Sequence, residues 1–67
     1  MDPTELLSAG SVTPRQAVER YGIPRSRIFE LLRHGELAKV KLSERKILIP
    51  VRSIEAYLAR HIVGKPQ

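Results

Sequence analysis

Arginine recurs through the segment from residue 25 to residue 33, which reads RSRIFELLR. A guanidinium group presents several N–H donors in one plane, so it can bind two acceptors at once on a guanine edge or a phosphate. At a helical spacing of about 100° per residue, Ile28, Leu31 and Leu32 lie on one side of the segment. The pattern predicts a helix with an apolar inner side and a polar, mainly basic outer side. The polar residues are Arg25, Ser26, Arg27, Glu30 and Arg33.

Positive charge is concentrated in the middle third of the chain. The net charge is +5, and the stretch from Arg25 to Lys46 holds seven basic and three acidic residues. A basic cluster attracts polyanions through the release of counterions, which makes nucleic acid the leading class of partner. On charge alone, a solvated basic face that keeps a small protein in solution explains the pattern equally well.

Two short helices with a tight break between them are predicted to position these side chains. Thr13 suits an N-cap, Pro14 suits the first helical position and Gly22 suits the C-terminal end, so a helix is expected from about residue 14 to residue 21. The second helix is expected from residue 24 or 25 to residue 33 or 34. Only about three residues separate them, as in a helix-turn-helix, where the first helix braces the second.

The remainder of the chain predicts a hairpin and two further helical segments. Residues 37–42 alternate in part and residues 47–49 are β-prone, so they read as a hairpin around the polar turn 43–46. Val12 is expected to be extended, and the apolar spacing after Pro50 predicts a last helix over about residues 52–62. The expected fold is mainly α with a small β-hairpin wing, a winged helix-turn-helix.

The expected domain organisation has three parts. Asp2, Pro3 and Glu5 favour a short helix within an N-terminal segment, residues 1–10, that is either helical or a flexible arm. Residues 11–62 form the winged helix-turn-helix domain, and residues 63–67 form a flexible tail.

Several kinds of chemistry lack the residues that they need. The chain has no cysteine, its two histidines are 27 positions apart, and it has no glycine-rich phosphate loop. We therefore expect no enzyme, no metal, no cofactor and no small-molecule substrate. No apolar run approaches the roughly 20 residues of a membrane span, and no signal peptide is evident, so we expect a cytoplasmic protein.

Seven short motifs follow one another in a characteristic order between Ser11 and Leu58. They are Gln16–Ala17, Gly22–Ile23–Pro24–Arg25, Ile28–Phe29, Leu31–Leu32, Gly35–Glu36–Leu37, Ile49–Pro50 and Ile54–Glu55–Ala56–Tyr57–Leu58. Together they resemble the excisionase-type DNA-binding domains related to the N-terminal domain of MerR regulators. The chain departs from that pattern at Pro24, where a capping Ser is frequent, and at Ile47–Leu48, where a Trp-Arg pair is frequent.

The resemblance implies double-stranded DNA as the partner and the second helix as the element that enters the major groove. Arg25, Ser26 and Arg27, near the start of that helix, are the first candidates for contact with bases. Glu30 and Arg33, further along, are candidates for a base edge or a phosphate. For Glu30, a surface ion pair with a neighbouring basic residue is the favoured alternative.

The remaining candidates concern the DNA backbone and the core. Lysine is a flexible point charge and suits contact with phosphate better than discrimination between bases. The alternative is that these basic residues only keep the protein in solution. Phe29 and Tyr57 are expected to pack at the edge of the core rather than stack on bases, and His61 is expected to be partly buried beside Ile62. Arg20 is expected to face solvent. The candidates for phosphate contact are Arg15, Lys39, Lys41, Arg45 and Lys46.

By resemblance, the protein is expected to be an excisionase, a recombination directionality factor of a bacterial or phage-infected cell. Such factors bind adjacent sites head to tail, bend the attachment-site DNA and assist a tyrosine integrase in excision. A small transcriptional regulator would need the same DNA-binding face, so sequence does not separate these two roles. A third hypothesis is a protein-interaction subunit of a phage complex, in which the basic face meets an acidic partner.

Overall fold

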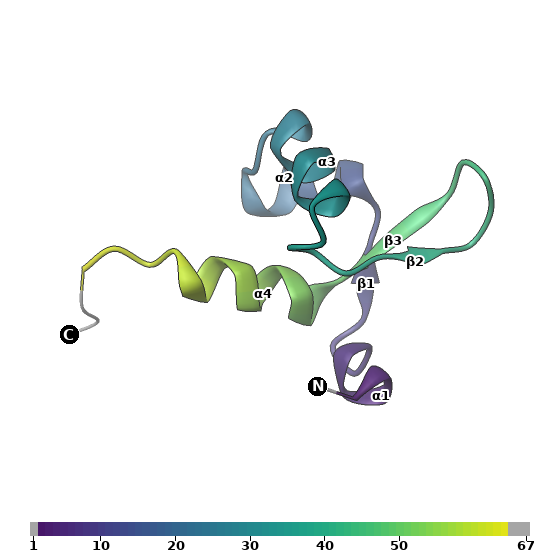
Figure 1. Cartoon of the computed structure of the whole chain (residues 1–67), viewed down its shortest axis with the longest axis horizontal. Helices are drawn as coiled ribbons and strands as arrows, with labels where there is room; N and C mark the ends of the chain where they lie inside the picture. Colours follow the sequence, from purple (N-terminus) through teal and green to yellow (C-terminus); the bar gives the residue numbers. More distant parts are fainter. Residues whose placement is uncertain (1, 65–67) are drawn as a thin grey trace.

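The structure, a computed structural model, describes residues 2–64. Its mainly helical fold with a small antiparallel sheet confirms the winged helix-turn-helix architecture that the sequence predicts (Figure 1). The tail expected over residues 63–67 lies partly outside the described residues. The elements in chain order are α1 (Pro3–Leu6), β1 (Ser11–Val12), α2 (Pro14–Tyr21), α3 (Arg25–Arg33), β2 (Val40–Lys41), β3 (Ile47–Pro50) and α4 (Val51–Arg60).

Helices α2 and α3 begin and end where the sequence predicts. Thr13 and Gln16 form a reciprocal capping box: Thr13 Oγ1 accepts from the Gln16 amide at 3.1 Å, and Gln16 Oε1 accepts from the Thr13 amide at 2.9 Å. Gly22 ends α2 in the left-handed region at φ 70°, and its N–H donates to the Val18 carbonyl at 3.0 Å. Ile23 then turns into the core, and only three residues, 22–24, separate α2 from α3.

The sheet has three strands in the order β1-β3-β2, all antiparallel. Val40 pairs with Leu48 and Lys41 with Ile47, which confirms the predicted hairpin with a shorter first strand. Residues 37–39 leave the ladder because Leu37 turns into the core. Val12 is extended as predicted. Its pairing with Ile49, which makes β1 a strand of the same sheet, was not predicted.

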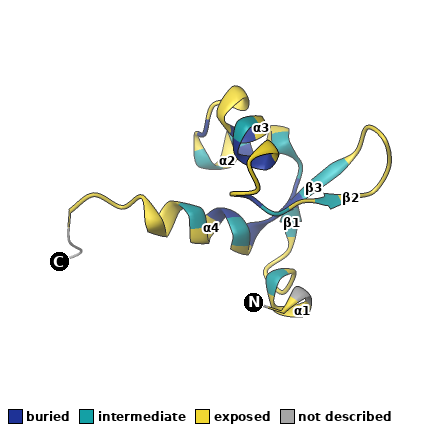
Figure 2. Ribbon diagram, in the orientation of Figure 1, coloured by how far each residue is buried: buried dark blue, intermediate teal, exposed yellow. Residues whose placement is uncertain are grey.

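The core lies where α2, α3, the sheet and the start of α4 meet, and the buried segments in Figure 2 converge there. In Figure 1, α2 and α3 lie on one side of the sheet, the hairpin extends away from α4, and α1 lies near the opposite side and contacts α4. Within residues 2–64, the buried hydrophobic residues of the core come from α2, α3, the sheet, the start of α4 and the turns that flank α3. These residues are Val12, Ala17, Ile23, Ile28, Leu31, Leu32, Leu37, Ile49, Val51 and Ile54.

Helix α4 starts one residue earlier and ends two residues earlier than the sequence predicts. Tyr57 is half-buried and packs against the core, as expected. The expectation for His61 is wrong: it is exposed, Ile62 is 64% exposed, and the His61 ring lies 4.4 Å from the Tyr57 ring, centroid to centroid. The reason is that the buried core reaches only the first half of α4. The apolar residues that continue the helical spacing beyond it have no core surface to pack against. Within residues 2–64, no helix has the length and apolarity that crossing a bilayer requires.

Candidate nucleic-acid interface

Helix α3 presents the two faces that its sequence predicts. Ile28, Leu31 and Leu32 are buried against the rest of the domain. Its polar residues lie on the outside: Arg25, Ser26, Arg27 and Arg33 are exposed, and Glu30 is half-buried. An α-helix with an exposed basic side has the dimensions to enter the major groove of DNA.

Glu30 forms an ion pair with Arg27, which is the alternative to base contact that the sequence favours. Arg27 Nη1 donates to Glu30 Oε1 at 2.8 Å, and the two side chains are 56% and 43% exposed. A pair this exposed contributes little to stability and can exchange its partner for a DNA group. Ser26 lies beside the pair, and these three residues line a shallow hollow together with Pro24.

The start of α3 is open to an anion, whereas the start of α2 is closed. No side chain caps α3 at Pro24, and the first backbone bond of the helix runs from the Ile28 amide to the Pro24 carbonyl at 3.0 Å. The amides of residues 25–27 therefore precede the helical ladder and are available to a phosphate or a base acceptor. At α2, the Thr13 capping box occupies the equivalent amide. Pro24, which has no side-chain acceptor, thus leaves the start of α3 accessible.

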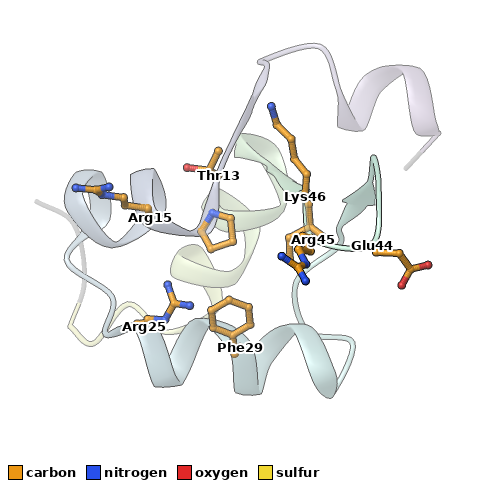
Figure 3. Close-up of a pocket in the computed structure, with 9 residues that line it drawn as sticks. Thr13, Arg15, Arg25, Phe29, Glu44, Arg45 and Lys46 are labelled. Atoms are coloured by element: carbon orange, nitrogen blue, oxygen red, sulfur yellow. The ribbon is translucent and has the colours of Figure 1, made fainter.

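A hollow separates α3 from the wing, which is formed by β2, β3 and the turn between them (Figure 3). We call it the α3–wing hollow. Arg15 of α2, Arg25 of α3, and Arg45 and Lys46 of the wing line it, and in Figure 3 the Arg15 guanidinium and the Lys46 ammonium point outward from it. In Figure 3 the Glu44 carboxylate, the acidic group of this lining, points away from Arg25. The lining residues are Thr13, Pro14, Arg15, Arg25, Phe29, Glu44, Arg45, Lys46 and Ile47.

Phe29 is part of this surface, and its expected packing at the edge of the core is wrong. The side chain is 39% exposed, and the Arg25 guanidinium carbon lies 4.8 Å from the centroid of its ring. Phe29 is one residue beyond Ile28 and is therefore rotated by about 100° from the centre of the apolar face. The wing leaves a hollow over the ring instead of covering it. The four-residue spacing of Arg25 and Phe29 places both on one helical face and is the signal that could have identified the pair.

The other two predicted phosphate contacts of this region, Lys39 and Lys41, lie away from the tip of the wing. Lys39, just before β2, lines a second hollow with Arg33 of α3. Lys41 is exposed and pairs directly with Ile47, so both side chains project from the same face of the hairpin. Lys39 thus lies close to Arg33 of α3, and Lys41 shares a face of the hairpin with Ile47, which lines both hollows.

Arg15 and Arg20 of α2 differ in their relation to the hollow. Arg15 lines it and makes a long contact with Glu19, 3.9 Å between Arg15 Nε and Glu19 Oε2, with both side chains mostly exposed. Arg20 is exposed, and its guanidinium carbon lies 5.5 Å from the Tyr21 ring centroid, outside the hollow. Arg15 is therefore the arginine of α2 that can contribute to the basic surface.

The described residues offer groups for binding rather than a cluster suited to a metal ion. Across residues 2–64, no three His, Asp or Glu side chains lie close enough together to hold one. The exposed donors are guanidinium, ammonium and backbone N–H groups on α2, α3 and the wing. All of these bind anionic oxygens, and the guanidinium groups also match the guanine edge.

The comparison with protein families agrees with this geometry. The family model of the helix-turn-helix domain matches residues 11–62, a range that contains every helix and strand described above except α1. Among curated proteins and among solved structures, nothing matches the chain significantly. The matched range holds the short α2–α3 turn and the exposed basic side of α3, and in a DNA-binding helix-turn-helix the second helix lies in the major groove. The chain therefore belongs to the helix-turn-helix domain family and is a DNA-binding domain of that family.

Proposed function

We propose that this protein is a sequence-specific accessory factor of site-specific recombination, an excisionase that binds and bends attachment-site DNA. The single observation that carries the DNA-binding part is the joint basic surface of α2, α3 and the wing around the α3–wing hollow. The recombination role is supported by the resemblance of residues 11–58 to excisionase-type domains of the MerR-related class.

The base-reading role goes to the outer side of α3. Ser26, Arg27, Glu30 and Arg33 face outward, and residues near the start of a recognition helix are those that usually meet base edges. Each bidentate contact of arginine with guanine discriminates by roughly 1–3 kcal/mol. The backbone role goes to Arg15 of α2, to Lys39 just before the wing, and to Lys41, Arg45 and Lys46 of the wing.

Several subunits acting together are part of the proposal. Bending a site of 20–30 base pairs costs on the order of 1–6 kcal/mol, and one domain of this size offers few contacts to offset it. Head-to-tail binding of copies along adjacent sites would share that cost. A tyrosine integrase is the partner that would use the bent DNA, in the cytoplasm of a bacterial or phage-infected cell.

Footprinting of the purified protein on the DNA that flanks its own gene tests this function. Protection of a tandem array of similar sites, with bending measured by gel mobility of circularly permuted fragments, is the expected result. A single palindromic footprint over a promoter would contradict the excisionase role and favour a small transcriptional regulator. If duplex DNA does not shift at moderate salt, the basic surface serves a protein partner instead.

A further inference from the structure

The two arginines in the first turn of α3 are held in different ways. Arg27 donates to the Glu30 carboxylate, whereas the Arg25 guanidinium lies over the face of the Phe29 ring. We propose that the α3–wing hollow seats the sugar–phosphate backbone of one DNA strand, and that Phe29 positions Arg25 for a phosphate there rather than for a base edge. The inference rests on the proposed DNA binding and assigns a different task to each side of α3.

The direction in which each side chain leaves the helix supports this division. At about 100° per residue, Arg25 and Phe29 lie about 60° and 100° from Ile28, whereas Ser26 and Glu30 lie about 160° and 200° from it. The first two therefore point toward the wing, and both line the hollow beside it. Ser26 and Glu30 point away from the core and line a different hollow. The side of α3 that faces directly outward is the one that would descend into the groove.

The chemistry of the hollow fits a backbone strand better than a base pair. Its cations come from three separate elements, namely Arg15 from α2, Arg25 from α3, and Arg45 and Lys46 from the wing. Phosphates follow one another at about 3.4 Å of helix axis along one DNA strand, so cations spread over several elements can meet successive phosphates. A base edge, in contrast, offers its acceptors at one point.

Phe29 has a specific effect on Arg25 because the ring restricts where the guanidinium group can lie. The guanidinium carbon is 4.8 Å from the ring centroid, within the range of a cation–π contact. An arginine side chain loses much rotational freedom when it binds, and a group already held near its bound position loses less. Replacing the ring by an aliphatic side chain of similar bulk should therefore weaken DNA binding by about two- to fivefold.

A double-mutant cycle tests the proposal, with four variants of the full chain: Phe29→Leu, Phe29→Tyr, Arg25→Ala, and Arg25→Ala combined with Phe29→Leu. Dissociation constants are measured at several salt concentrations on two duplexes of equal length. One duplex carries the sequence selected by the wild-type protein from a random pool, and the other is unrelated. Thermal unfolding of each variant, followed by circular dichroism, reports whether a loss of binding comes from a loss of folding.

We expect Arg25→Ala to weaken binding to both duplexes by a similar factor and to lower the salt slope by about one unit. Phe29→Leu should weaken binding to both duplexes, and Phe29→Tyr, which keeps the ring face, should bind like the wild type. In the Arg25→Ala background, Phe29→Leu should have no further effect. That non-additivity is the signature of a positioning residue, because a merely structural role would persist without Arg25.

The opposite results overturn the inference. A loss of binding by Arg25→Ala confined to the selected duplex would make Arg25 a base-reading residue. An equal effect of Phe29→Leu with and without Arg25 would show that the ring acts independently of the arginine. Failure of the proposed function looks different: the wild-type protein would bind the selected and unrelated duplexes equally well. In that case the salt slopes and the cycle still decide whether Arg25 and Phe29 act together on a phosphate.

Discussion

The backbone amide of Ala38 donates a hydrogen bond of 2.8 Å to the side-chain oxygen of Ser53. The two residues are 15 positions apart, one in the segment that leads from α3 to the wing and the other in the first turn of α4. Ala38 lies beside the buried Leu37, so its amide has limited access to water. The bond therefore fixes the base of the wing to α4.

Ser53→Ala is expected to destabilise the fold by about 1–2 kcal/mol, because it leaves the partly buried Ala38 amide without its acceptor. Urea unfolding followed by circular dichroism measures the change. Ser43→Ala, in the exposed turn of the wing, is the matched control and should change the free energy of unfolding by less than about 0.5 kcal/mol. Equal effects of the two substitutions would contradict a structural role for the bond.

Leu31→Ala is expected to cost about 2–5 kcal/mol of folding free energy, since the side chain is 2% exposed and its removal leaves a cavity under α3. A domain of this size has a small free energy of unfolding, so much of the Leu31→Ala variant should be unfolded at ambient temperature. Denaturant unfolding followed by the helical circular dichroism signal measures the change in folding free energy. Leu42→Ala removes the same atoms from a side chain that is 54% exposed and should be nearly neutral. If Leu31→Ala is also neutral, the inner face of α3 is not what anchors the helix.

Local signals in the sequence were sufficient to predict α2 and α3. The capping box of Thr13 and the left-handed position at Gly22 are decided by residues within four positions of each helix end. The exposed basic side of α3 follows from helical periodicity in the same way. Elements of this kind can be located from sequence because their defining interactions are short in range.

The features that were missed depend on partners distant in the chain. Strand β1 is only two residues long, and it exists because Val12 meets Ile49, 37 positions later. The exposure of Phe29 depends on how far the wing stands from α3, which periodicity does not encode. The exposed end of α4 has a similar origin, since the apolar spacing up to Ile62 gives no information on where the core ends.

Arg27→Ala is expected to weaken binding to the selected sequence more than binding to an unrelated duplex, by a difference of about 1–3 kcal/mol, because a base contact carries sequence information. Competition binding with the two duplexes measures the ratio of affinities. Arg20→Ala removes the same charge from α2, away from the hollow that Arg27 lines with Ser26 and Glu30, and should leave that ratio unchanged. An equal loss on both duplexes would assign Arg27 to a phosphate, with Glu30 as its partner only in the free protein.

Lys46→Ala is expected to lower the affinity for all DNA sequences to a similar extent and to flatten the salt dependence by about one unit, since a phosphate contact releases one counterion. Lys46 lies in the wing and lines the α3–wing hollow with Arg25. Arg60→Ala, in the last turn of α4, removes one positive charge away from this hollow and should leave the salt slope near its wild-type value. Both variants lower the net charge by one, so a difference between them depends on position and not on total charge. If the two slopes fall equally, the DNA responds to the overall charge of the domain, and the wing has no particular contact with the backbone.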